Sequence, residues 1–486
     1  MSSPFDEAKY NALLKGLEVS EVKFSNLKAE NRELRIDAEY FQKEYLYEDN
    51  SLSKHKIATL GDYAFITDGQ HGYYESDSSS NIHMLAARNC KDYFANTIDA
   101  LPLAKWVDDK NKRSSLSHGD IILSTRGSVG CCAIVYDEVL PANINQDVAR
   151  IKLNDTEVFS PEFLITYMNC KFGQNWMLRN QTGMVQQGLP LDKVRAIPVP
   201  VLSSDFQTQI EKIVKSAHTK LSESKSLYAK AEEILLLELG LKDWQQKNES
   251  VSVKKFSDFT SSNRLDAEYY QRKYDELFEK LSHFPQTEIK DIISYPVSSG
   301  STPKAGDSEY YADEKTGVPF LRAVDIVQSR IDTNNLMYIK PNVHRGLLKR
   351  TQLKKGDVLF SIAGTVGRCG IFDYDFEANI NQAIAILRFD ESLVKHLYVV
   401  QFFNSKVGQL VIEKYARQGL QTNLNLEELS NMPLPILPLK TQEQIAELIQ
   451  KSFALRAESK RLLEEAKKMV EAEIEQGKDA VKQGNK

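Results

Sequence analysis

The sequence predicts a mixed α+β protein with a pseudo-two-fold internal repeat, in which an antiparallel coiled coil of two long helices separates two globular domains of helices and strands. Three observations predict this fold. Motifs of the first half recur roughly 235 residues later. Short β-rich runs alternate with turn residues inside each half. Each half ends in a long segment with the spacing of a coiled-coil seam.

The repeat is clearest in two motifs. Arg35-Ile-Asp-Ala-Glu-Tyr-Phe41 recurs as Arg264-Leu-Asp-Ala-Glu-Tyr-Tyr270, and GDIILSTRGSVG at 119–130 recurs as GDVLFSIAGTVG at 356–367. Ala-Asn-Ile-Asn-Gln follows in both halves, at 142–146 and 378–382, and a Pro-x-Pro pair comes later at 198–200 and 433–435. Residues 13–17 also resemble 237–241, as a circularly permuted repeat would. We infer that one ancestral unit was duplicated.

The first part of each repeat predicts a globular domain. Strands are expected at 120–124, 133–136, 148–152, 357–361 and 383–387, and helical stretches at 161–178 and 394–415. The expected boundaries are an N-terminal segment at 1–30 that completes the circular repeat, a first globular domain at 31–203, a central helix at 204–245, a second globular domain at 246–439 and a C-terminal helix at 440–486.

The two long helices carry alternating four-three spacing. The predicted seam positions are Ile210, Val214, Ala217, Leu221, Ser224, Tyr228, Ala231 and Leu235 in the first helix, and Ile445, Leu448, Ser452, Leu455, Ser459, Leu462, Ala466 and Met469 in the second. Small residues recur every seventh position, which lets two backbones approach closely. We therefore predict that the helices pair with each other. The alternative is that each helix packs only on its own globule as an amphipathic helix.

Composition excludes several classes of protein. With 486 residues, 42% hydrophobic and 27% charged, the chain is long and apolar enough for packed cores. It has no apolar run of membrane-spanning length and no signal-peptide pattern at its start, so we expect a soluble cytoplasmic protein. The five cysteines form no Cys-x-x-Cys pair, which favours reduced, mostly buried thiols over a metal site.

The motifs of common enzymes are missing. The sequence has no phosphate-binding loop, no His-Glu-x-x-His, no Gly-x-Ser-x-Gly and no Asn/Asp-Pro-Pro-Tyr/Phe loop. Asp313-Glu314-Lys315 faintly resembles a nuclease carboxylate cluster, but its repeat counterpart keeps no such acids, which favours plain surface charge. The residues therefore predict a non-catalytic binding or scaffolding protein, with no cofactor or metal of its own.

Polar loops with basic neighbours form the candidate DNA-binding surface. Lys-Arg pairs precede the Gly-Asp turn in both repeats, which suits phosphate contacts, although solvated loops are the alternative. Loop Gln, Asn and Arg side chains can contact base edges, and these loops differ between repeats while their frames do not. The candidates are Gln70, His71, Arg88, Asn89, Lys112, Arg113, Arg126, Gln186 and Gln187 in the first repeat, and Ser301, Thr302, Lys304, Arg322, Lys349, Arg350, Arg417, Gln418, Gln421 and Asn423 in the second.

Taken together, these motifs resemble the specificity subunit of type I restriction-modification enzymes. The resemblance covers essentially the whole chain and rests on motifs in the same order in both repeats, clearest in the second: Arg-Leu-Asp-Ala-Glu-Tyr-Tyr at 264–270, Gly-Ser-Thr-Pro at 300–303, Gly-Val-Pro-Phe-Leu-Arg at 317–322 and Asn-Ile-Asn-Gln at 379–382. The first repeat departs from the pattern at 70–74 and 81–86, which makes carry-over of contact residues less safe there.

The resemblance implies a role in a DNA restriction system. It implies two target recognition domains, each reading one half of a bipartite site in double-stranded DNA, with the helix pair as a ruler between them. It also implies two modification subunits that methylate adenine with S-adenosylmethionine, and restriction subunits that use ATP and Mg²⁺. The alternatives are a specificity subunit of another methylation-based defence system, or a coiled-coil protein scaffold.

Overall fold

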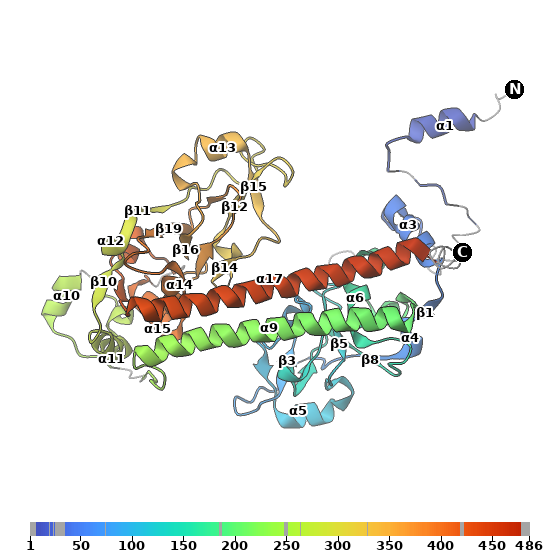
Figure 1. The fold of residues 1–486 in the computed structure, drawn as a ribbon. Coiled ribbons are helices and arrows are strands. Elements are labelled where there is room, and N and C mark those ends of the chain that lie inside the picture. Colours follow the sequence, from blue (N-terminus) through green and yellow to red (C-terminus); the bar gives the residue numbers. More distant parts are fainter. Residues whose placement is uncertain are drawn as a thin grey trace. The chain divides into compact units, whose positions relative to one another are not determined.

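The computed structural model describes residues 6–18, 20–22, 24, 35–72, 74–183, 187–246, 251–262, 264–327, 329–417 and 422–477. The chain divides into two units, Met1–Leu221 with Arg456–Lys486, and Ser222–Leu455. Each unit mixes helices and strands, so the predicted mixed fold class is confirmed. The long helices α9 (Ser204–Glu238) and α17 (Leu439–Gln476) begin where the sequence predicts, and each contributes residues to both units (Figure 1).

Unit 1 contains a four-stranded sheet at its centre. Its order is β2-β8-β5-β6, with every pair antiparallel. A three-stranded sheet β4-β3-β7 and a pair β1-β9 complete the strands. The bounds are β1 (Ile57–Thr59), β2 (Ala64–Asp68), β3 (His83–Leu85), β4 (Leu101–Pro102), β5 (Ile121–Ser124), β6 (Cys132–Ile134), β7 (Ala142–Ile144), β8 (Val148–Leu153) and β9 (Pro198–Pro200). All four residues of β5 are buried, as its unbroken apolar run predicts.

Unit 2 repeats this topology. Its four-stranded sheet is β11-β19-β16-β17, its three-stranded sheet β15-β12-β18 and its strand pair β10-β20, with an additional pair β13-β14. The bounds are β10 (Gln286–Glu288), β11 (Ile293–Ser299), β12 (Val318–Leu321), β13 (Ile326–Val327), β14 (Arg330–Ile331), β15 (Met337–Ile339), β16 (Asp357–Ser361), β17 (Cys369–Phe372), β18 (Asn379–Ile380), β19 (Ile384–Phe389) and β20 (Pro433–Pro435). The duplication inferred from motifs therefore extends to strand order.

Helices flank these sheets at matching places. Each predicted helical stretch is two helices, broken at Cys170 and at Ser405. The helices besides α9 and α17 are α1 (Glu7–Leu14), α3 (Lys43–Leu52), α4 (Leu60–Tyr63), α5 (Lys105–Lys110), α6 (Pro161–Asn169), α7 (Lys171–Arg179), α8 (Leu191–Arg195), α10 (Phe256–Ser262), α11 (Arg272–Leu281), α12 (Ile289–Ile292), α13 (Pro341–Arg345), α14 (His396–Asn404), α15 (Lys406–Tyr415) and α16 (Leu426–Ser430). Within the described residues, no helix combines the length and apolar character needed to cross a bilayer.

The core of each unit includes residues of both long helices. In unit 1, Val214 of α9 and Val470 of α17 join the cluster that contains Ile121 and Phe163. In unit 2, Leu235 of α9 and Ile445 of α17 join the cluster around Phe360 and Phe403. Each long helix therefore contributes to the core of both units, whereas the alternative interpretation expected each helix to pack only on its own globule.

The helices also contact each other through the small residues of the seam. In unit 1 the Ser459 hydroxyl donates to the carbonyl of Ala217 at 2.7 Å. In unit 2 the Ser452 hydroxyl donates to the carbonyl of Ser224 at 2.8 Å. All three serines are buried, and each bonds a polar group across the seam, which offsets the cost of burying a hydroxyl.

The buried face departs from the predicted seam at Leu448 and Tyr228, and the predicted seam residues Leu221, Leu455, Leu462 and Met469 are also only half-buried. Leu448 is only half-buried, and Ile449 is the fully buried residue of that turn. Tyr228 is half-buried, and its hydroxyl lies 2.6 Å from the Ser329 hydroxyl, so this side chain reaches the globular part of unit 2. A straight helix has about 3.6 residues per turn, whereas a strict seven-residue repeat needs about 3.5, so the buried face of the helix drifts towards later positions along the chain.

The thiols are unreactive structural groups. Four of the five cysteines are buried and none forms a disulfide, as predicted. Burial raises the pKa of the Cys170 thiol to about 12. A thiol in such surroundings stays protonated and packs as a small apolar side chain.

Burial of Glu48 on α3 makes the stability of unit 1 depend on pH. Burial raises the pKa of its carboxyl to about 7, although the Asn175 amide donates to it at 2.8 Å. The folded state thus holds this proton more tightly than the unfolded state does. This contribution to the free energy of unfolding is therefore present at acid pH and is lost as the pH rises through 7. We expect Glu48→Gln to raise the free energy of unfolding at pH 8 by on the order of 1–2 kcal/mol after solvent screening, with little effect at pH 4.

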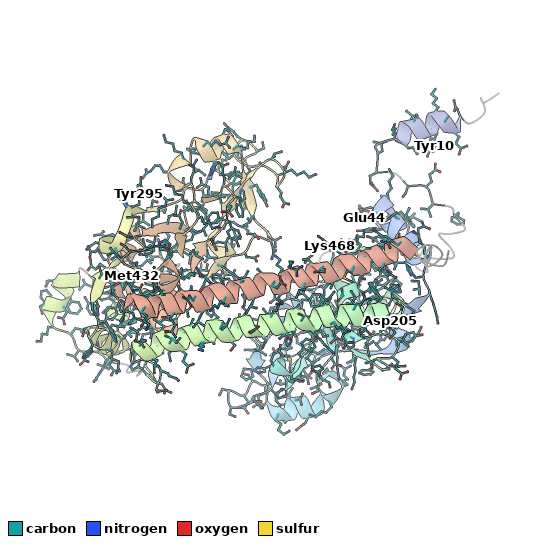
Figure 2. The ribbon with its side chains drawn as sticks, in the orientation of Figure 1. Tyr10, Glu44, Asp205, Tyr295, Met432 and Lys468 are labelled. Atoms are coloured by element: carbon teal, nitrogen blue, oxygen red, sulfur yellow. The ribbon has the colours of Figure 1, made fainter. Side chains whose placement is uncertain are left out.

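Urea unfolding of both proteins at the two pH values checks this expectation. The charge of Glu44, at an exposed position of the same helix, also raises the pKa of Glu48, so Glu44→Gln should stabilise the protein at pH 8 by less than Glu48→Gln does (Figure 2). A wild-type protein equally stable at pH 4 and pH 8 would contradict the assignment.

Candidate nucleic-acid interface

A buried ion pair fixes the Gly-Asp turn in each unit. In unit 1, Asp120 accepts from the Arg150 guanidinium at 2.7 Å and from the backbone N–H of Ser117 at 2.7 Å. In unit 2, Asp357 and Arg388 make the same pair, with bonds of 2.7 and 2.8 Å. The side chains of Asp120 and Arg150 are only 3% and 6% exposed. These pairs hold the start of β5 and β16 against β8 and β19.

The Asn-Ile-Asn-Gln motif forms a fixed turn beside each sheet. The Asn143 side chain accepts from the N–H of Ile144 and donates to Asp108 at 2.8 Å. Asn379 accepts from Ile380 and, at 2.7 Å, from the Thr351 hydroxyl. Both asparagines are fully buried. The first asparagine of the motif therefore has a structural role in both repeats.

The first polar loop is bound to this turn in both units. Gly69 lies so close to it that an added Cβ would come within 1.8 Å of the Ile144 carbonyl oxygen, and Gly300 within 2.1 Å of the Ile380 oxygen. Any other residue would push the loop away. In unit 1 the backbone N–H of Gln70 donates to Ile144 at 3.1 Å. The base of the loop is thus fixed, and its side chains extend from a common frame.

The third polar loop is also connected to this part of the sheet in each unit. In unit 1 Gly188 pairs with both Arg126 and Thr182, and in unit 2 Asn423 pairs with both Ala363 and Arg417. The Arg126 guanidinium is 3.5 Å from Asp147, directly after the turn. Gln187 and Asn423 are exposed, whereas Gln186, Gln418 and Gln421 lie outside the described residues. Each unit thus gathers its first loop, its turn and its third loop into one surface.

Three basic side chains of unit 1, His71, Lys112 and Arg113, are paired with acids on this surface. Asp68 at the end of β2 binds His71 at 2.7 Å and Arg113 at 3.2 Å. Burial alone would raise the pKa of Asp68, but the His71 bond and the Arg113 charge outweigh it and hold this pKa below its ordinary value. Lys112 contacts Asp108 at 2.6 Å and Asp109 at 3.0 Å. Arg113 and the first loop, far apart in sequence, therefore meet at Asp68.

Unit 2 leaves the equivalent cations uncompensated. Lys349 and Arg350 occupy the short turn that matches Lys112 and Arg113, and both are exposed. Within the described ranges neither has an ion-pair partner. Lys304 is likewise exposed and without an acidic partner there. The two units thus present the same frame, but the cations of this turn are paired with acids in unit 1 and unpaired in the described part of unit 2.

One predicted contact residue belongs to the interior instead. Asn89 is fully buried, where its side chain accepts from the N–H of Ala86 and donates to the carbonyl of Ile98 at 2.9 Å. It is therefore a structural residue and cannot present its amide to a base. Arg88 beside it is exposed. Arg322 is two-thirds buried and is held by Asp325 at 3.0 Å and by the Asn335 carbonyl at 2.8 Å.

Two glutamines join the surface although they were not among the predicted contacts. Gln146 and Gln382 end the Asn-Ile-Asn-Gln turn, between the first and third loops. Gln382 is exposed, and its backbone N–H donates to the Thr302 hydroxyl at 3.3 Å. The repeat itself carried part of the signal, because a polar residue at the same place in both halves is a contact candidate, but only the fold shows that neither glutamine is buried.

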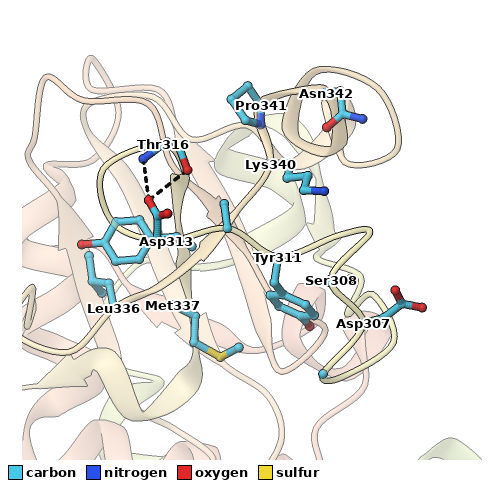
Figure 3. Close-up of a pocket in the computed structure, with 13 residues that line it drawn as sticks. Asp307, Ser308, Tyr311, Asp313, Thr316, Leu336, Met337, Lys340, Pro341 and Asn342 are labelled. Carbon is cyan, nitrogen blue, oxygen red and sulfur yellow. Dashed lines mark hydrogen bonds between the residues drawn. The ribbon is translucent and has the colours of Figure 1, made fainter. Parts of the chain in front are cut away.

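A surface hollow of about 1040 Å³ lies in unit 2 between the 306–316 loop and the start of α13 (Figure 3). Its wall includes Tyr311, Met337 and Lys340. Asp313 at its edge accepts from the N–H and the hydroxyl of Thr316, at 3.0 and 2.9 Å, so this carboxylate closes a turn. No group of three metal-ligating side chains occurs in the described part of the chain.

Comparison with known families finds a match for residues 283–455 of unit 2 and for the part of α17 up to residue 468. Residues 283–468 match the family model for the type I restriction modification DNA specificity domain. This segment belongs to that domain family. The match covers less than half of the chain, and it includes every candidate residue of the second repeat. Unit 1 carries the same sheet order as the specificity domain, as described above.

Three proteins of known name resemble parts of the chain. The EcoBI type I restriction enzyme specificity subunit of Escherichia coli is 28% identical over 142 residues, which are 29% of this chain and 30% of that protein. The putative MjaX specificity subunit of Methanocaldococcus jannaschii is 24% identical over 182 residues, 36% and 41% of the two chains. The putative specificity subunit S.HindORF215P of Haemophilus influenzae is 34% identical over 98 residues, 20% and 24%. The matched segments span between 24% and 41% of these relatives.

Two solved structures align with most of the chain at low similarity. The type I restriction-modification S subunit of M. genitalium has a TM-score of 0.37 and 11% identity, over 85% of this chain and 92% of that one. The HsdS subunit of Thermoanaerobacter tengcongensis has a TM-score of 0.28 and 14% identity, over 86% and 96%.

Proposed function

We propose that this chain is the DNA recognition subunit of a type I restriction-modification complex. In this proposal each unit is a target recognition domain that binds one half of a bipartite DNA site. The observation that carries it is the repeated surface of first loop, Asn-Ile-Asn-Gln turn and third loop, found in the specificity domain and again in unit 1. The frames are the same and the loop side chains differ, so the two half-sites differ and the target is asymmetric.

The rest of the complex supplies the chemistry. The helices α9 and α17 pair as an antiparallel coiled coil that separates the recognition domains, sets the spacing of the half-sites and docks two modification subunits. These use S-adenosylmethionine to methylate adenine, and restriction subunits use ATP and Mg²⁺. This chain acts in the cytoplasm, without catalysis of its own, by placing those subunits on DNA.

Charge on the recognition surface contributes affinity more than specificity. We expect Lys349→Ala with Arg350→Ala to weaken DNA binding by the assembled complex. The slope of the logarithm of the binding constant against the logarithm of the salt concentration should become shallower by about 2, because each of the two phosphate contacts releases about 0.9 counterions. The preferred sequence should not change. Titration of a labelled duplex at several salt concentrations measures both quantities.

A matched control comes from a neutralised cation in the same unit. Lys355 pairs with Asp373 at 3.6 Å and Asp375 at 3.1 Å, so Lys355→Ala should leave the salt dependence unchanged. A changed recognition sequence in the double variant would show instead that Lys349 or Arg350 contacts bases.

Methylome sequencing tests the proposed function directly. A host expresses the methyltransferase encoded beside this chain's gene, once with this chain and once without it. An asymmetric, gapped motif methylated at adenine only when the chain is present supports the proposal. An unchanged methylome, with both proteins shown to be expressed, would count against it and favour a protein scaffold.

A further inference from the structure

The Arg-x-Asp-Ala-Glu-Tyr motif forms the same anchored turn in both units. Arg35 donates two bonds of 2.8 Å to the Asp37 carboxylate and a third to the carbonyl of Arg179, the last residue of α7. Arg264 binds Asp266 in the same bidentate way and donates at 2.9 Å to Tyr415, the last residue of α15. The motif arginine thus satisfies unpaired carbonyls at a helix C-terminus, where a cation is favoured.

The motif tyrosine completes the anchor. The guanidinium of Arg35 lies 4.8 Å from the ring centre of Tyr40, and that of Arg264 lies 4.6 Å from Tyr269. A second cation from the helix end covers the same ring, Arg179 at 4.0 Å in unit 1 and Lys414 at 4.9 Å in unit 2. Arg, Asp and Tyr of the motif are therefore accounted for by the fold.

The other three residues of the motif point away from this anchor. Because Arg and Asp two positions apart bind each other on one side of an extended segment, the residue between them must point to the opposite side. Ile36 is 81% exposed and Leu265 is 82% exposed. Ala38 and Glu39, with their counterparts Ala267 and Glu268, are also exposed, and neither short turn contains a buried residue.

The exposed residues are kept although the fold does not require them. A large aliphatic side chain, an alanine and a glutamate occupy equal positions in two repeats that have diverged in the helix that follows, KEYLYEDNSL against RKYDELFEKL. A single exposed aliphatic residue is ordinary. An exposed aliphatic residue at the same place of the anchored turn in both repeats indicates a contact with another molecule.

We propose that residues 36–39 and 265–268 are two equivalent docking surfaces, each for one copy of the same partner protein. This inference rests on the proposed function, which makes the partner the modification subunit, and it adds a second contact that this subunit needs besides the one proposed for the helices. The carboxylates of Glu39 and Glu268 would be repelled by DNA phosphates, so the surface suits a protein. The complementary patch is an apolar pocket for Ile36 or Leu265 with a lysine or arginine at its rim for the glutamate.

Stoichiometry tests the proposal. This chain is co-expressed with the modification subunit, and native mass spectrometry counts the subunits in the purified complex. We expect two modification subunits with the wild type, one with Ile36→Asp, one with Leu265→Asp and none with both changes. Reversing charge through Glu39→Lys with Glu268→Lys should weaken assembly on the order of tenfold.

Controls separate docking from folding and from the proposed function. Ile98→Asp, at another exposed aliphatic position of unit 1, should keep two modification subunits. Circular dichroism should give all variants the melting temperature of the wild type, as their exposure predicts. Two subunits on the folded double variant would overturn the inference, and so would unchanged assembly with weakened DNA binding. If the wild type itself carries none, the proposed function fails instead.

Discussion

Inserting seven residues after Leu221 and seven more after Leu455 is expected to lengthen the gap in the DNA target while both half-sites stay unchanged. These positions lie at the division between the two units in each helix, so the core of each unit keeps its own residues. Seven residues are two helical turns and preserve the seam between α9 and α17. They add about 10 Å to the helix pair.

The added length corresponds to about two to three base pairs, since B-DNA rises about 3.4 Å per pair. A longer gap also rotates one half-site about the duplex axis relative to the other. Methylome sequencing of a host that carries the lengthened chain measures the gap. Insertion into α9 alone is the matched control and should abolish methylation, because the Ser452 and Ser459 bonds lose their register. A changed half-site sequence would contradict the proposed role of the helices as a spacer.

Replacing Asp120 with alanine is expected to destabilise unit 1 by about 3–5 kcal/mol, because it leaves the buried Arg150 guanidinium without its partner. Arg150 also donates to the Arg113 carbonyl at 3.0 Å, so the basic turn of the candidate interface should move as well. Hydrogen exchange measured by mass spectrometry should show faster exchange in β5 and β8. The strands β16 and β19 should keep their protection.

The repeat supplies the mirror experiment. Asp357→Ala removes the equivalent partner of Arg388 and should loosen β16 and β19 while β5 and β8 stay protected. Methylation of the bipartite target should fall in both variants, since each loses one half of the recognition surface. Equal loss of protection in both units from either variant would mean that they unfold as one cooperative body.

Local periodicity explains why the helices and strands could be predicted. Ser224, Ser452 and Ser459 were placed at the seam from spacing alone and are buried there. The predicted strands of the four-stranded sheets all occur, because each is an apolar run closed by turn residues. Leu448 was chosen over Ile449 because a strict heptad does not follow the slight drift of a real helix.

The candidate interface was less predictable because its chemistry depends on distant contacts. Asn89 has the side chain of a base-contacting residue, but bonds to Ala86 and Ile98 bury it. The charge of Arg113 is shared with Asp68, which precedes it by 45 residues, and nothing local to Arg113 reveals this. Residue type gives the possible chemistry, whereas exposure and pairing come only from the fold.

The composition of the unit 1 core has a consequence for synthesis on the ribosome. That core includes Ala466, Val470 and Ile474 of α17, which are translated last. The core of unit 1, whose strands are made first, is therefore completed only when α17 has been made. The corresponding core cluster of unit 2 takes its buried residues from 231–449. Domains generally fold as units as the chain emerges. A chain that terminated early in α17 would thus leave the core of the first-made domain incomplete.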